Sequence, residues 1–189
     1  MNAETSTSPS AWSFTKAFHK ESYPAISPSR PENNQAGKVV VIAGGSTGIG
    51  YGIARAFAGA SASRVIITGR RSKVLRSSVV ALSEETKAAG SETVIDGRCL
   101  DVTSIDETLA FWQALKNEGI TVNVLVLNAA TSSARATILD LGRDKLWQDF
   151  VINVRTLMDW TEHFYKQENS DKHKRKVLKV KQSVDRGFR

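Results

Sequence analysis

Cysteine is nearly absent from this sequence: Cys99 is the only one among 189 residues. One thiol cannot form a disulfide within the chain, and such usage is typical of a reducing compartment, so we expect a cytoplasmic protein. We expect Cys99 to pack in or beside a strand. Histidine is scarce too, because only His19, His163 and His173 occur. They form no ligand spacing with a cysteine or carboxylate cluster, so we predict no metal site.

Long apolar runs are also missing. No stretch approaches the roughly 20 apolar residues that a membrane-spanning helix needs. The first residues, MNAETSTSPSAW, lack the charged-then-apolar pattern of a secretory signal. Hydrophobic residues make up 41% and charged residues 24%, which is ordinary for a globular protein. The sequence therefore predicts no membrane span, and one domain with a sizeable core.

The positive charge is confined to the end of the sequence. The formal net charge is +7, and residues 170–189 supply +6 of it through eight Lys or Arg against two Asp. A basic chain can indicate a nucleic-acid partner, but the other residues are nearly neutral, which argues against one. Two interpretations of residues 172–181 remain: a solvated basic tail, or attachment to a nucleic acid or membrane surface.

Short apolar runs alternate with amphipathic stretches after residue 37. Residues 1–36 are polar and rich in Ser, Pro and Asn, so we interpret them as an irregular N-terminal arm. Residues 37–169 are predicted to be a Rossmann-type NAD(P)-binding domain, and residues 170–189 a basic tail. Strands are expected at 38–43, 64–68, 93–100 and 122–130, and helices at about 48–57, 72–89, 104–118 and 143–166. This alternation predicts the α/β class, with a doubly wound, Rossmann-like parallel sheet.

A glycine-rich turn follows the first predicted strand. VVVIAGGSTGIG, residues 39–50, places Gly44, Gly48 and Gly50 between that strand and a helix. Glycine lets the chain leave the strand sharply and approach a pyrophosphate closely, and the helix N-terminus attracts phosphate. A glycine-rich turn with no ligand is the alternative. The strand before it and the helix after it favour a dinucleotide.

The second predicted strand bears on the choice of cofactor. An acidic residue about twenty positions past the glycines would bind a ribose 2′-hydroxyl. The chain has Thr68-Gly69-Arg70-Arg71 there, with no Asp or Glu. A guanidinium can pair with a 2′-phosphate instead. The sequence therefore favours NADP(H) over NAD(H), unless Arg70 and Arg71 are only solvated surface charge.

Together these motifs resemble those of the short-chain dehydrogenase/reductase family. Ala43-Gly44-Gly45-Ser46-Thr47-Gly48-Ile49-Gly50 is similar to the family's T-G-x-x-x-G-I-G, with Ala43 at the Thr position. Asp101-Val102 resembles the family's adenine-contacting Asp. Asn128-Ala129-Ala130 resembles its N-A-G motif on the cofactor floor. The segment SYPAISPSRPE resembles arms of fungal members. The resemblance implies hydride transfer between NADP(H) and an alcohol or carbonyl of a small-molecule substrate.

One asparagine and three tryptophans stand out on predicted helices. Asn153 lies mid-helix, where its side chain competes with backbone hydrogen bonds, so it is either a satisfied core residue or a functional one. The resemblance implies the family's catalytic Asn, which positions a water in a proton relay. We expect Trp112, Trp147 and Trp160 to pack in the core.

The family's remaining catalytic pattern, Y-x-x-x-K, is not found. Tyr23, Tyr51 and Tyr165 are followed four residues later by Ser, Arg and Asn. Val177, Leu178 and Val180 resemble the fifth strand, but Lys179 and Lys181 interrupt it, and burying an unpaired ammonium is costly. The sequence leaves open whether Ser183, near the place expected for the family's catalytic Ser, has any role.

We therefore expect an incomplete family member, truncated before the Y-x-x-x-K motif, with a sheet incomplete at the C-terminal side. We expect a chain of this form to be inactive or nearly so as an enzyme. A non-catalytic dinucleotide-binding module, whose basic tail binds an anionic partner, is the alternative. The sequence indicates neither the substrate nor the oligomeric state.

Overall fold

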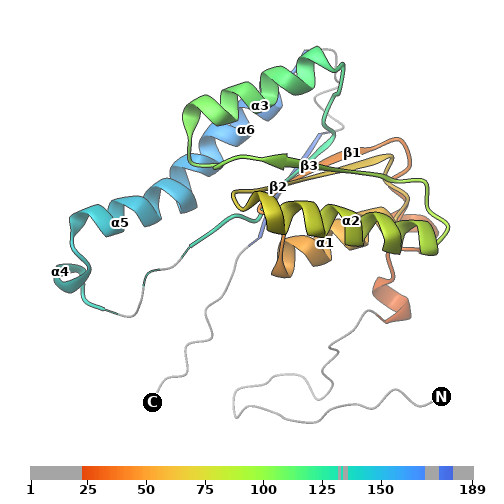
Figure 1. The fold of residues 1–189 in the computed structure, drawn as a ribbon, viewed down its shortest axis with the longest axis horizontal. Helices are drawn as coiled ribbons and strands as arrows, with labels where there is room; N and C mark the ends of the chain where they lie inside the picture. The colour runs from red at the N-terminus through yellow and green to blue at the C-terminus, as the bar shows by residue number, and fades with distance from the viewer. Residues whose placement is uncertain (1–22, 132, 134–135, 169–174, 181–189) are drawn as a thin grey trace, which may run out of the picture.

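A computed structural model describes residues 23–131, 133, 136–168 and 175–180, in which strands and helices alternate (Figure 1). The strands are β1 (Val39–Ala43), β2 (Arg64–Gly69), β3 (Val94–Cys99), β4 (Val124–Leu127) and β5 (Lys176–Lys179). The α-helices are α1 (Gly48–Gly59), α2 (Ser72–Ala88), α3 (Ile105–Asn117), α4 (Ile138–Leu141), α5 (Arg143–Phe150) and α6 (Thr156–Lys166). The short turns are η1 (Pro24–Ile26) and η2 (Pro31–Asn33), and a π-helical turn, η3 (Val151–Arg155), joins α5 to α6.

The five strands form one sheet in the order β3-β2-β1-β4-β5, and each neighbouring pair is parallel. Helices α3 and α6 cover one face and helices α1 and α2 cover the other (Figure 1). This is the doubly wound parallel sheet that the alternation of elements predicts. The part of the chain that the structure describes contains no helix with the length and apolarity needed to cross a membrane.

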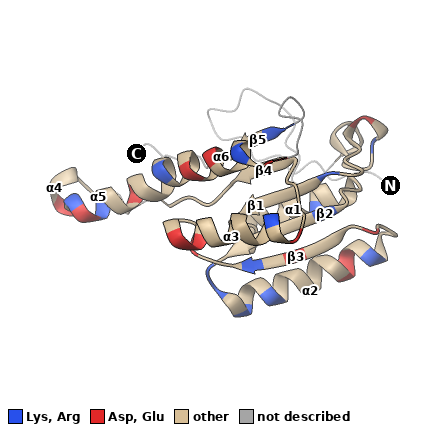
Figure 2. Cartoon of the chain, turned by 90° about the horizontal axis from the view of Figure 1, so that it is seen from above, with Lys and Arg blue, Asp and Glu red and all other residues tan. Residues whose placement is uncertain are grey.

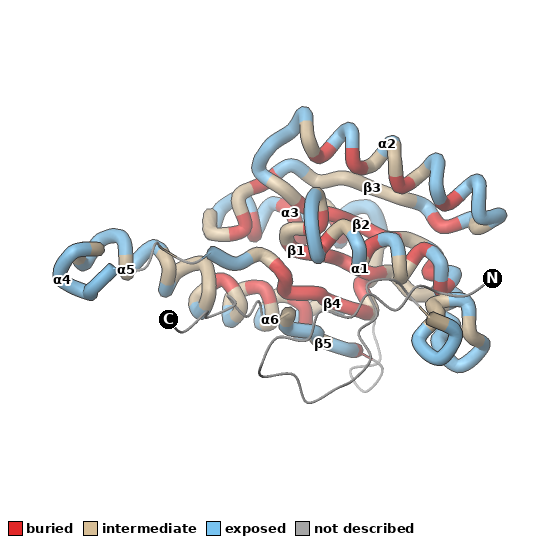
Figure 3. The backbone as a smooth tube through the Cα atoms, turned by 90° about the horizontal axis from the view of Figure 1, so that it is seen from below, coloured by how far each residue is buried: buried red, intermediate tan, exposed pale blue. Residues whose placement is uncertain are grey.

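The run of valines in β1 is explained by burial on both faces. Val40 and Ile42 pack with α1 and α2, whereas Val41 packs with α3 and α6. Successive side chains of a strand point to opposite faces, so a central parallel strand needs apolar residues at every position. Figure 3 shows the buried backbone along the central strands, and shows α4 and much of α5 as exposed.

Strand β5 forms an edge of the described sheet, so a lysine on it can reach solvent and need not be buried. Lys176 and Lys179 are exposed there, and among the described residues their strand pairs with β4 alone (Figure 2). Lys181 and Ser183 lie outside the described residues. Before β5, Arg175 is 6% exposed and donates hydrogen bonds to the Phe164, Tyr165 and Gln167 carbonyls, each at 2.8 Å. A cation at this place satisfies the carbonyl groups that end a helix.

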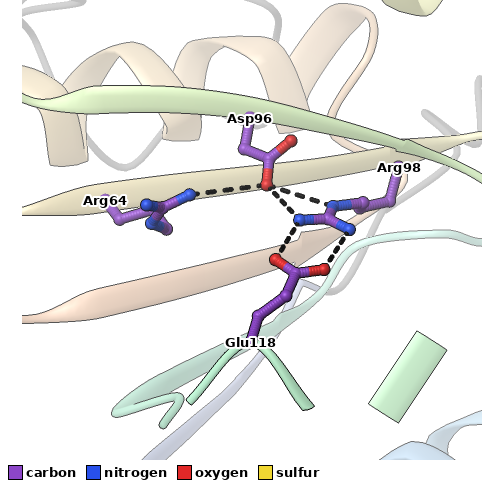
Figure 4. Close-up of polar contacts among 4 residues, drawn as sticks. All are labelled: Arg64, Asp96, Arg98 and Glu118. Atoms are coloured by element: carbon purple, nitrogen blue, oxygen red, sulfur yellow. Dashed lines mark hydrogen bonds and ion pairs between the residues drawn. The ribbon is translucent and has the colours of Figure 1, made fainter. Parts of the chain in front are cut away.

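A network of charged side chains joins β2, β3 and the end of α3 (Figure 4). Asp96 and Arg98 lie two residues apart on β3, and Arg98 donates to the Asp96 carboxylate at 2.7 and 3.0 Å. Arg98 also binds both carboxylate oxygens of Glu118, at 2.8 and 2.7 Å, and Arg64 lies 3.6 Å from Asp96. These contacts attach the C-terminal end of α3 to the edge strand β3.

Two expectations about packing are wrong. Trp112 and Trp160 are buried as expected, but Trp147 is 62% exposed. Helix α5 extends past the sheet, and none of the described elements forms a second layer over it (Figure 1). Cys99 lies at the end of its strand but is exposed, because β3 is an edge strand.

Candidate functional site

A cavity of about 560 Å³ opens at the carboxyl ends of the strands. It is lined by eleven of the residues that the sequence singles out: Gly44, Ser46, Thr47, Gly48, Ile49, Arg70, Arg71, Val102, Asn128, Ala129 and Ala130. Ligands of doubly wound sheets bind in this place, where the direction of strand order reverses. Here the reversal lies between β1 and β4, beside the glycine turn.

The turn between β1 and α1 forms the middle of the cavity. Gly44 and Gly48 have φ angles of +78° and +56°, which disfavour a side chain. A Cβ on Gly44 would also lie 3.0 Å from Cα of Ala129, whereas one on Gly48 would meet nothing within 4 Å. The turn is therefore close-packed against the segment that follows β4 and open toward the cavity.

Gly50 lies in the first turn of α1 and brings that helix against the turn. A Cβ there would lie 2.1 Å from the Gly44 carbonyl oxygen and 2.6 Å from Nδ2 of Asn128. Gly50 itself does not line the cavity. Thr47 precedes α1 without capping it through its side chain, and the first turn has no acidic residue. The N-terminus of α1 thus keeps the positive potential that suits an anion.

Asn128, the residue after β4, binds the glycine turn. Its Nδ2 donates to the Gly44 carbonyl at 2.7 Å, and its own N–H donates to the Ala43 carbonyl at 3.2 Å. The side chain is buried, and Oδ1 has no hydrogen-bond partner among the described residues. A buried acceptor without a partner is uncommon. This oxygen beside the cavity fits a bound group that carries a donor.

Arg70 and Arg71 follow β2 at the other end of the cavity. Nη1 of Arg70 lies 3.7 Å from Oδ2 of Asp101, and the Arg70 side chain is 68% exposed. Asp101 stands at the margin and does not line the cavity. Its Oδ1 accepts hydrogen bonds from the N–H and hydroxyl of Thr103, at 2.9 and 2.8 Å. The side chain of Cys99 lies 3.6 Å from the Arg70 carbonyl. One guanidinium–carboxylate pair, Arg70 with Asp101, thus lies at this end of the cavity, and Arg71 lines the cavity next to Arg70.

Two residues of the long helix that α5, η3 and α6 form together bind the loop after β3, which carries Val102. Trp160 donates its indole N–H to the Val102 carbonyl at 3.1 Å, and Arg155 donates to the Thr103 carbonyl at 2.6 Å. Trp160 therefore does more than pack, because it positions the loop after β3.

Asn153 lies in the π-helical turn η3 and does not line the cavity. Its Nδ2 donates to the Thr131 carbonyl at 2.7 Å, and its Oδ1 accepts from the Thr131 N–H at 3.1 Å. The side chain thus holds the backbone just after Ala130 through two hydrogen bonds. π-Turns interrupt the regular hydrogen-bond ladder and are frequent at functional sites.

Three lining residues were not predicted: Gly69, Leu100 and Ile152. Gly69 and Leu100 directly precede Arg70 and Asp101, which the motifs marked, so their place in the sequence could have indicated them. Ile152 lies in η3 next to Asn153, and a plain apolar residue in a helix gives no such signal. The described ranges hold no cluster of three His, Cys, Asp or Glu side chains that could bind a metal.

Parallel strands, a glycine turn at a helix N-terminus and a cavity across the switch point define the dinucleotide-binding class of α/β proteins. Comparison with known proteins identifies the family: the "short chain dehydrogenase" family model matches residues 38–181. The chain belongs to the short-chain dehydrogenase family.

Curated relatives and solved structures agree with this membership. A short chain dehydrogenase/reductase of Claviceps purpurea is 38% identical over 131 residues, which are 69% of this chain and 42% of that protein. A short chain dehydrogenase of Pseudocercospora fijiensis is 31% identical over 140 residues, 73% of this chain and 43% of that protein. The chain thus spans less than half the length of these relatives.

Two solved structures show the same fold. A metagenomic short-chain oxidoreductase in complex with NADP has a TM-score of 0.59 and 28% identity, over 69% of this chain and 55% of that one. The NADP active-site complex of Pseudomonas aeruginosa RhlG has a TM-score of 0.60 and 25% identity, over 69% and 48%. The Rossmann-like class is therefore confirmed.

Proposed function

We propose that this chain binds a nicotinamide dinucleotide, NADP(H) in preference to NAD(H), across the cavity at the carboxyl ends of its strands. The observation that carries the proposal is the glycine turn, which is packed against Ala129 on one side and open to the cavity at Gly48. The pyrophosphate would bind at the N-terminus of α1, on Ser46, Thr47, Gly48 and Ile49. Two similar structures that contain NADP support this assignment.

The adenosine half belongs at the β2 and β3 end of the cavity. Val102 would contact the adenine, and Asp101 would accept a hydrogen bond from it. The guanidinium groups of Arg70 and Arg71 would bind the 2′-phosphate that distinguishes NADP(H) from NAD(H). A carboxylate in their place would repel that phosphate. The two arginines are therefore the basis for the NADP(H) preference.

The nicotinamide half belongs at the β4 end, on Asn128, Ala129 and Ala130. When bound, the nicotinamide supplies or accepts the hydride in the family's interconversion of alcohols and carbonyl compounds. Asn153 would hold the Thr131 backbone at that end and take the place of the family's catalytic Asn. Family membership supports a small-molecule substrate.

We propose further that this 189-residue chain by itself does not turn over substrate. Its sequence contains no Y-x-x-x-K pair to transfer the proton that accompanies the hydride. Loss of a general acid–base typically lowers a rate by 10²–10⁴-fold. Carbonyl reduction by the purified chain that an Asn153→Ala change abolishes would contradict this proposal.

Titration of the purified chain with NADPH and, in parallel, NADH tests cofactor binding. Thermal unfolding and calorimetry would follow each titration. A ligand at 100 times its dissociation constant stabilises the folded state by about 2.7 kcal/mol, so a clear rise in melting temperature is expected with NADPH and a smaller one with NADH. A folded chain that responds to neither would contradict the proposal.

A further inference from the structure

The loop that follows Ala130 is attached to the long helix at two places. Asn153 binds both backbone groups of Thr131. One helical turn earlier, Oδ2 of Asp149 accepts a hydrogen bond from the Ser133 N–H at 2.9 Å. Residues four apart lie on one face of a helix, so Asp149 and Asn153 both face the loop and bind neighbouring parts of its backbone.

Asp149 differs from the other acidic side chain of α5. Its side chain is 18% exposed, whereas that of Asp144 is 89% exposed. Lys145 Nζ lies 3.6 Å from the second carboxylate oxygen of Asp149. The pKa of Asp149 is lowered, because the Ser133 side chain, the Ser133 N–H and Lys145 lie beside its carboxylate. The group facing Ser133 is thus a carboxylate at neutral pH.

The wall at the β4 end of the cavity lies next to the backbone of Thr131 and next to η3. Ala130, just before the loop, lines the cavity, and so does Ile152, which lies between Asp149 and Asn153 in sequence. Arg70 and Arg71 lie at the opposite end, after β2. A dinucleotide whose 2′-phosphate meets these arginines must place its nicotinamide half near Ala130 and Ile152.

We propose that Asp149 is a positioning residue for the nicotinamide half of the cofactor site, acting through the Ser133 N–H; this rests on the proposed cofactor binding. A carboxylate that accepts from a backbone N–H makes a stronger hydrogen bond than a neutral acceptor does. Without it the loop gains conformational freedom, and binding of the nicotinamide half must order it again. The adenosine half, at the other end, does not depend on that order.

The test compares two ligands by calorimetry on the full chain. NADP⁺ reaches both ends of the cavity, whereas 2′,5′-ADP carries the adenosine and the 2′-phosphate without the nicotinamide ribose. Asp149→Ala should weaken NADP⁺ binding by about tenfold and 2′,5′-ADP binding by less than about twofold. Asp149→Asn, whose amide oxygen still accepts from Ser133, should lie between wild type and Asp149→Ala.

Asp144→Ala is the matched control, because it removes an acidic residue from the same helix at an exposed position. It should leave both affinities unchanged. Hydrogen exchange gives a readout that needs no ligand. The Ser133 amide should lose protection in Asp149→Ala, while amides of β4 such as that of Val126 keep theirs.

Each other outcome has a definite meaning. If the wild-type chain binds no NADP⁺, the proposed function fails and the role of Asp149 fails with it. If the wild type binds and Asp149→Ala binds both ligands equally well, only the positioning role is wrong. Equal losses for the two ligands, with lost protection in β4, would make Asp149 a general support of the fold and would also overturn the proposal.

Discussion

Of the described glycines, Gly50 leaves the least room for a side chain. A side chain there would collide with the Gly44 carbonyl and with Asn128, so the helix α1 would have to move away from the phosphate turn. Gly52, two residues later on the same helix, has no neighbour within 4 Å of an added Cβ. The two glycines therefore form a natural pair for experiment.

Gly50→Ala should weaken NADPH binding by at least about tenfold and lower the melting temperature, because backbone atoms must shift to admit the methyl group. Gly52→Ala should leave binding unchanged and hold or raise the melting temperature, because alanine is the better helix former by up to about 1 kcal/mol. Calorimetry and thermal unfolding measure both. Wild-type affinity in Gly50→Ala would contradict the close packing.

Arg70 and Arg71 allow a second test at the residue scale. The double change Arg70→Ala and Arg71→Ala should weaken NADPH binding by roughly tenfold or more, because the 2′-phosphate loses its guanidinium partners. NADH has no 2′-phosphate, so its binding should stay nearly unchanged. The measured quantity is the ratio of the two dissociation constants. Arg76→Ala, on the exposed side of α2, is the control for loss of positive charge. An unchanged ratio in the double variant would refute the assignment.

At the scale of elements, the charged network of Figure 4 attaches α3 to the edge strand β3. Arg98→Met removes the guanidinium group that joins Asp96 to Glu118, so both carboxylates lose their hydrogen bonds to it. The melting temperature should fall by about 2–4 °C. Lys116→Met removes an exposed ion pair of the same helix, with Glu168, and should change little. Equal effects of the two changes would show that the network does not secure the helix.

The same network predicts a dependence on pH. Hydrogen bonds from Arg98 hold the pKa of Glu118 below its ordinary value of 4.5, so the folded state binds the proton less readily than the unfolded state. This contribution to stability is present above the unfolded pKa and is lost as the pH falls through the folded pKa. The stability difference between wild type and Glu118→Gln should therefore be constant from pH 8 to about 5 and shrink below it. Denaturant unfolding at several pH values measures it, and a difference that grows in acid would contradict the pairing.

At the scale of the whole molecule, the long helix presents an apolar stripe to solvent. Trp147, Phe150, Val154 and Met158 are 62%, 48%, 38% and 67% exposed, and their spacing places them on one side of α5, η3 and α6. The rings of Trp147 and Phe150 stack on each other 5.3 Å apart. Contiguous exposed apolar surface of this kind promotes association.

The purified chain should therefore associate in a concentration-dependent way, above its own mass of 20.6 kDa. The double change Trp147→Glu and Met158→Glu should shift the population toward that mass, as measured by light scattering after gel filtration. Val80→Glu, an exposed apolar position on α2, should not. A wild-type chain that stays at 20.6 kDa at every concentration would refute this prediction.

The sequence by itself determined the alternation of strands and helices from β1 to β4, the parallel sheet and the phosphate turn; it indicated neither α4 nor the π-helical turn that separates α5 from α6. These follow from local causes. Valines at every position of β1 require two covered faces, and positive φ angles at Gly44 and Gly48 require glycine. Such signals lie within a few residues of one another, so periodicity and motif spacing reveal them.

Only the tertiary structure decided which of those residues meet and what surrounds them. Trp147 is apolar and on a helix, yet exposed, because α5 extends past the sheet. Lysines fit β5 because that strand is an edge. The partners of Asn153 and Asp149 are backbone groups of Thr131 and Ser133, and a backbone group carries no mark in the sequence. Burial and hydrogen bonding depend on segments distant in the chain, and the chain must fold before those segments become neighbours.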